Sequence, residues 1–248
     1  MTSEHIVKSF DEQLNRLEET IAEMGGLAET QLADAIDALL KRDTDKAAQV
    51  AAADVRIDAM EAEVDQLAVS LLALRQPMAS DLRAIVSALK TSAILERIGD
   101  YAKNVAKRTA ALAEFPPVPP AFPVARLGRV AQEMIKDVLD AYLGRDVEKA
   151  EMVWERDKEL DTLYTSVFRE LLTYMMEDPR NITSCTHLLF VAKNIERIGD
   201  HTTNIAENVL FLVQGKFPSE DRQKDDASSF TVVRPTATGG GGGGGRSP

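Results

Sequence analysis

The pentapeptide Glu-Arg-Ile-Gly-Asp occurs twice in this chain, at 96–100 and at 196–200, and each copy is followed by an asparagine four residues after the aspartate. In a helix, the glutamate and the aspartate of each copy lie one turn apart on one face. Like charges at this spacing destabilise a helix by about 0.2–0.5 kcal/mol. A helical fold does not require such a pair, so its repetition indicates a function.

Two further acidic pairs occur upstream of these copies, and each half of the chain carries one of them on its predicted second helix. Hard divalent cations bind several carboxylate oxygens, and two neighbouring helices can each contribute two carboxylates. We therefore expect a divalent or trivalent metal ion (Fe, Zn, Mn or Mg). The candidate metal ligands are Asp54, Asp58, Glu96, Asp100, Asp157, Asp161, Glu196 and Asp200. The alternative is that these pairs form solvated acidic faces. The pairs on the third helices are expected opposite the apolar stripes, and those on the second helices at the flank of the heptad seam.

Five neighbouring polar residues are candidates for support of a metal or for contact with a partner. Asn104 and Asn204 can add an amide oxygen or hold a ligand water. Arg97 and Arg197 can pair across helices or meet an anion. His201 follows Asp200 directly, although a single histidine is more often a hydrogen-bonding residue than a metal ligand.

Apolar residues recur three and four positions apart along most of the chain, which predicts amphipathic helices. Over 45–75 the spacing is that of heptads, so near-parallel, coiled-coil-like packing is expected. The chain should therefore be all-α. The predicted helices span 4–41, 45–75, 81–113, 124–143, 146–176 and 181–214.

The chain also contains an internal duplication. Residues 42–50 (RDTDKAAQV) match 145–153 (RDVEKAEMV) at an offset of 103, and the third helices match at an offset of 100. We expect two tandem three-helix bundles related by a quasi-twofold axis. The predicted boundaries are 1–113 for the first bundle, 114–123 for a linker with five prolines, 124–214 for the second bundle and 215–248 for a disordered glycine-rich tail.

Composition excludes several classes of protein. The 248 residues carry a formal net charge of −11, which argues against a nucleic-acid binder. No apolar run is long enough for direct membrane insertion, and the start lacks the apolar core of a signal peptide. A single cysteine, Cys185, fits a reducing cytoplasm. We find no phosphate-cradling glycine loop, nucleophile elbow or thiol–histidine pair, so the chain is not expected to be an enzyme.

Two other classes compete with a regulatory role. A carboxylate-bridged metalloprotein of the storage or di-iron type would need Glu-x-x-His on core-facing positions, and none of the three histidines has a glutamate three residues before it. A plain helical scaffold would satisfy the heptads but leaves the repeated pentapeptide unexplained.

The segments LRQPMASDLRAIVSALKTSAILERIGDYAKNVA and ERIGDHTTNIAENV, together with the acidic pairs and the duplicated unit, resemble the PhoU family of bacterial phosphate-transport accessory proteins, over about residues 5–214. The resemblance implies a cytoplasmic negative regulator of the phosphate-starvation response. Its partners would be the ATPase of the phosphate ABC transporter and a membrane-bound sensor histidine kinase, through which it could lie at the inner membrane. It also implies a homodimer, and metal ions at the acidic motifs.

Overall fold

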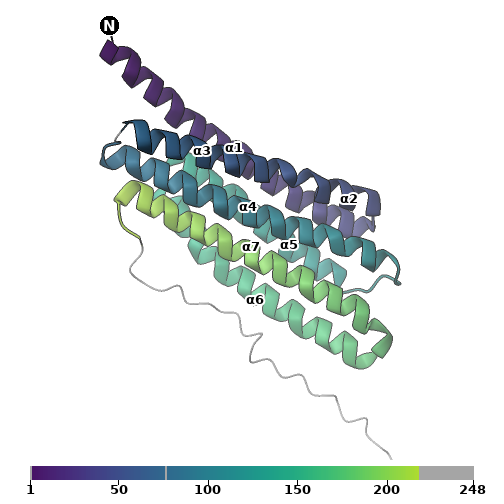
Figure 1. Ribbon diagram of the computed structural model, residues 1–248. Helices are drawn as coiled ribbons and strands as arrows, with labels where there is room; N and C mark the ends of the chain where they lie inside the picture. The colour runs from purple at the N-terminus through teal and green to yellow at the C-terminus, as the bar shows by residue number, and fades with distance from the viewer. Residues whose placement is uncertain (1, 76, 218–248) are drawn as a thin grey trace, which may run out of the picture.

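The computed structural model describes residues 2–75 and 77–217, and every regular element within them is a helix, which confirms the all-α prediction (Figure 1). None of these helices combines the length and apolarity needed to cross a membrane. The elements are α1 (Thr2–Lys41), α2 (Thr44–Ala53), α3 (Val55–Arg75), α4 (Ala79–Ala113), α5 (Ala121–Gly144), α6 (Val147–Glu177), the 3-10 helix η1 (Pro179–Asn181) and α7 (Ile182–Gln214).

Helices α4 and α7 lie side by side at the centre of the molecule (Figure 1). Ser87 lies against Asn208 and Arg108 against His187, so the two helices run antiparallel. Helix α3 packs on the other side of α4, and α6 packs on the other side of α7. Helices α1 and α5 contact each other and cover α4 and α7. Apolar side chains of both repeats form one continuous core, so the two units are packed as one body.

The two repeats turn from their first to their second helix in the same way. Arg42 and Arg145 occupy equivalent positions and both adopt left-handed backbone conformations, with φ of 58° and 51°. This conformation is uncommon outside glycine. Asp43 and Asp146 follow them, and each carboxylate caps the next helix by accepting a hydrogen bond from the N–H three residues later. Two uncommon turns with the same cap support the internal duplication.

Two helix boundaries differ from those predicted by more than two residues. The segment 45–75 is divided at Asp54, where the N–H of Ile57 donates to the carbonyl of Asp54 at 2.8 Å, three residues away rather than four, and tightens the turn. Helix α5 begins at Ala121, inside the predicted linker 114–123, because Pro123 falls in its first turn, where proline costs no hydrogen bond. The part of the predicted tail from 218 onwards lies outside the described residues.

The glycine of each repeated pentapeptide allows its helix to approach the second helix of the same unit closely. A methyl group on Gly99 would lie 3.0 Å from Cδ1 of Ile57 and 3.1 Å from Oδ1 of Asp54. A methyl group on Gly199 would overlap Cδ2 of Leu160 and lie 3.3 Å from Oδ1 of Asp157. In both units, therefore, an aspartate of the second helix region lies in contact with the glycine of the pentapeptide.

The substitution Gly199→Ala should lower the free energy of unfolding by about 1–3 kcal/mol, because the added methyl group overpacks the α6–α7 contact. Gly26→Ala is the matched control, since nothing lies within 4 Å of the added carbon. The control should gain about 0.5–1 kcal/mol from helix propensity. Urea denaturation of both variants measures the difference, and equal stability of the two would contradict this account.

Candidate functional site

The predicted acidic residues of the first unit lie at the α2–α3 junction, on α3 and on α4, and of these Asp58 is exposed. We call Asp54, Asp58, Glu61, Glu96 and Asp100 the N-terminal carboxylate cluster. Asp54 is buried, with 2% of its surface exposed. Its Oδ2 accepts a hydrogen bond from Nζ of Lys103 at 2.6 Å and its Oδ1 accepts one from Nε2 of Gln31 at 3.0 Å. Nζ of Lys103 also donates to Oδ1 of Asp100 at 3.2 Å. One ammonium group therefore joins the α2–α3 junction to α4.

Burial, and after it neighbouring like charges, raises the pKa values of the two glutamates of this cluster. Burial raises the pKa of Glu96, the neighbouring Asp100 carboxylate raises it further, and Arg97 opposes both. Burial likewise raises the pKa of Glu61, and the carboxylates of Asp65 and, to a smaller extent, Asp58 raise it further. Glu61 was not predicted as a site residue, although it follows Asp58 by three residues and so shares its helix face.

The second unit buries its acidic residues more deeply. We call Asp157, Asp161, Glu196 and Asp200 the C-terminal carboxylate cluster. Only 1–2% of the surface of Asp157, Asp161 and Glu196 is exposed. Nζ of Lys193 lies 2.9 Å from Oε2 of Glu196. The alternative of solvated faces is wrong for these three side chains, because α6 packs against the side of α7 that faces away from its apolar stripe. The lysines of both clusters were not predicted.

Four of the five supporting residues, together with Tyr101, lie along the α4–α7 contact or on its outer surface. The rings of Tyr101 and His201, which are equivalent in the duplication, stack with centroids 5.5 Å apart. Cζ of Arg197 lies 5.8 Å from the centroid of the Tyr101 ring. Asn104 and Asn204 are exposed. His201 thus contacts the other unit, and its contact with Tyr101 lies at the quasi-twofold axis that relates the two repeats.

The fifth supporting residue, Arg97, points toward its own unit. Its Nε lies 3.6 Å from Oε2 of Glu96, and 62% of its side-chain surface is exposed. It also lowers the pKa of Glu61 on α3. Arg97 is therefore a partly solvated counter-charge for the N-terminal carboxylate cluster.

The arrangement of the donors does not fit a metal ion as it stands. Among residues 2–75 and 77–217, no three His, Cys, Asp or Glu side chains come together in a group that could hold one. In the N-terminal carboxylate cluster, the ammonium of Lys103 lies where a cation would bridge Asp54 and Asp100. The carboxylate donors are of the type that hard cations prefer. The type of the donors thus favours a metal ion, whereas their arrangement does not provide a site for one. Metal binding by the eight predicted ligands stays a prediction.

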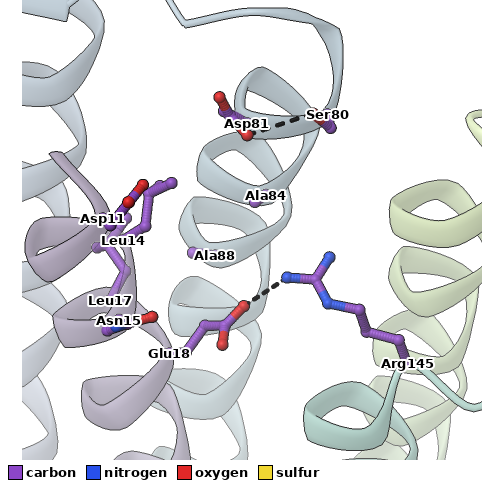
Figure 2. Close-up of a pocket in the computed structure, with 10 residues that line it drawn as sticks. All are labelled: Asp11, Leu14, Asn15, Leu17, Glu18, Ser80, Asp81, Ala84, Ala88 and Arg145. Atoms are coloured by element: carbon purple, nitrogen blue, oxygen red, sulfur yellow. Dashed lines mark hydrogen bonds and ion pairs between the residues drawn. The ribbon is translucent and has the colours of Figure 1, made fainter. Parts of the chain in front are cut away.

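A cleft of about 370 Å³ lies elsewhere, between α1, the start of α4 and the end of α5 (Figure 2). Nη2 of Arg145 donates to Oε1 of Glu18 at 2.6 Å across it (Figure 2). Asp11 and Asp81 add acidic groups to its wall, and Leu14 adds an apolar one. None of the predicted site residues lines this cleft.

The raised pKa of Glu96 predicts that Glu96→Gln stabilises the protein at neutral pH. The folded protein binds a proton at Glu96 more tightly than the unfolded chain does, so the ionised form costs stability above the folded pKa. The gain should shrink as the pH falls through the raised folded pKa toward 4.5, the ordinary value, and vanish below it. Melting followed by circular dichroism at pH 7.5 and at pH 4 tests this, with exposed Glu151→Gln as control. An equal gain at both pH values would refute the electrostatic cause.

Comparison with known proteins shows the family. The model of the PhoU domain matches residues 21–109 and 124–209, one match in each repeat. Relatives named phosphate-specific transport system accessory protein PhoU homolog include that of Caulobacter vibrioides, 51% identical over 92% of this chain and 99% of its own. That of Rhizobium meliloti is 50% identical over 92% of this chain and 97% of its own.

Two solved structures show the same fold. The crystal structure of PhoU from Pseudomonas aeruginosa matches with a TM-score of 0.81 at 42% identity, over 84% of this chain and all 100% of that one. The phosphate transport system regulatory protein PhoU from Streptococcus pneumoniae matches with a TM-score of 0.79 at 27% identity, over 85% of this chain and 100% of its own. The duplicated helical unit, the matched domains and these relatives together show that the chain belongs to the PhoU family.

Proposed function

We propose that this chain is a non-enzymatic cytoplasmic regulator of phosphate uptake and of phosphate-starvation signalling. In this role it is an adaptor between the ATPase of the phosphate ABC transporter and a sensor histidine kinase, and it represses the response when phosphate is plentiful. The observation that carries the proposal is the PhoU match in both repeats, with relatives named as transport accessory proteins over nearly their whole length.

An adaptor communicates only if a partner binds it with different affinity in the partner's two states. The two repeats offer equivalent surfaces on either side of the α4–α7 contact, which suits a protein that bridges two partners or forms a homodimer. The net charge of −11 favours partners with basic patches. Such binding weakens as salt screens the exposed charges.

A strain that lacks this gene should express a phosphate-starvation reporter in excess phosphate, because the kinase would no longer be held in its repressing state. Measurement of the reporter in the wild type, the deletion strain and the deletion strain complemented with the gene tests this. Complementation should restore repression. A reporter that stays off in the deletion strain, with no second copy of the gene present, would contradict the proposed function.

A metal-binding role is the second candidate, and it is favoured by the burial of Asp157, Asp161 and Glu196 on the adjacent helices α6 and α7. Buried carboxylates are costly unless a cation or hydrogen bonds compensate their charge. The identity of the metal is left to measurement.

Protein purified without a polyhistidine tag should retain Fe, Zn, Mn or Mg in inductively coupled plasma mass spectrometry, and replacement of Asp100 and Asp200 by alanine should reduce the amount. Loss of two carboxylates removes a large part of the ligand charge, so a fall of about tenfold or more in affinity is expected. Wild-type protein that holds no metal even after incubation with these four ions would eliminate this candidate.

A further inference from the structure

The N-terminal carboxylate cluster already contains a cation that belongs to the chain. Nζ of Lys103 lies 2.6 Å from Oδ2 of Asp54 and 3.2 Å from Oδ1 of Asp100. Only 26% of the Lys103 side chain and 2% of the Asp54 side chain are exposed. A lysine side chain ordinarily carries a positive charge at neutral pH, so this contact places an ammonium between the two carboxylates.

A buried carboxylate such as Asp54 requires this kind of partner. An ionised carboxylate removed from water is strongly unfavourable unless it is paired and hydrogen-bonded. Asp54 has both, from Lys103 on α4 and from Gln31 on α1. A divalent ion that entered between Asp54 and Asp100 would have to displace Lys103, break two charge-assisted hydrogen bonds and overcome the repulsion of the ammonium.

The second repeat provides an internal comparison. Gly99 and Gly199 lie against Oδ1 of Asp54 and of Asp157 in the same way, so the two clusters are built alike at this point. The residue equivalent to Lys103 is Thr203, which carries no charge and whose hydroxyl donates to the carbonyl of Asp200 at 2.7 Å.

The lysine of the second unit occupies a different position. Lys193 contacts Glu196 from one turn before it, and the equivalent residue in the first unit is Ala93. The carboxylate positions are therefore shared by the two units, whereas the positions of their ammonium groups are not.

We infer that Lys103 takes the place of a metal ion in the N-terminal carboxylate cluster, so that this half of the chain is closed to divalent cations and opens to them when the ammonium is removed. The inference rests on the contacts of Asp54, Asp100 and Lys103. It refines the metal-binding candidate, because it predicts that the two halves respond differently to divalent cations. It does not depend on the adaptor role.

The substitution Lys103→Met tests the inference, because it removes the charge and keeps an unbranched stem of similar length. In EDTA its melting temperature should lie about 10 °C below that of the wild type, since the Asp54 charge loses its partner. Addition of 1 mM Mn²⁺ should raise the melting temperature of this variant by about 5 °C more than that of the wild type. Lys107→Met, an exposed lysine on the same helix, is the matched control and should behave like the wild type.

The C-terminal half is unchanged in these variants, so the difference between their Mn²⁺ responses reports on the N-terminal half alone. The double variant Asp54→Asn/Lys103→Met has no buried charge to compensate. It should melt near the wild-type temperature in EDTA and lose the extra response to Mn²⁺. If Lys103→Met does not fold in EDTA, its recovery from urea in Mn²⁺ gives the same information.

Equilibrium dialysis should find one more Mn²⁺ per chain in Lys103→Met than in the wild type. Equal Mn²⁺ responses of these two proteins, or no recovery of an unfolded variant in Mn²⁺, would overturn the inference. Wild-type protein that binds no Mn²⁺ would count against the metal-binding candidate for this ion, while the comparison between variant and wild type still decides the role of Lys103.

Discussion

The buried Asp54 carboxylate must be compensated, and this requirement constrains how the helices of the N-terminal half pack. Gln31 reaches it from α1 and Lys103 from α4, while Gly99 leaves room for its Oδ1 beside the α4 backbone. Three elements must therefore be in register before this charge is satisfied. An unpaired buried charge would be strongly unfavourable, so the pairing selects one packing of the three helices.

Helices α4 and α7 join the N-terminal repeat, with its Asp54 site, to the C-terminal repeat. Tyr101 and His201 occupy equivalent positions and stack on each other, so the two repeats meet about a quasi-twofold axis. The carboxylate clusters lie on either side of this pair, each between the central helix and the second helix of its unit. One shared apolar core holds the two clusters in place. The two related units therefore form one body with a shared core.

Both clusters break local rules of helix stability. Like charges recur at one-turn spacing, and burial raises the pKa of Glu61 and of Glu96. Packing of the apolar stripes compensates for this cost. Residues that contradict local preference are expected at functional sites rather than in a scaffold. The difference between the repeats, with Lys103 in one and Lys193 in the other, further indicates that the clusters have diverged while the helices around them stayed the same.

The sequence by itself determined the helices, the duplication and the acidic pairs, because apolar spacing and repeated residues are properties of the chain order. It also placed Asp54 and Asp157 at equivalent positions. Only the tertiary structure decided which carboxylates are buried, and which lysine meets each one. The periodicity of a helix shows which residues share a face. Which other helix covers that face is determined by packing between segments that are distant in the sequence. The same limit explains why the burial of Asp161, which was expected at the flank of the heptad seam, could not be predicted. It also explains why the contact of Lys103 with Asp54, 49 residues away, could not be predicted.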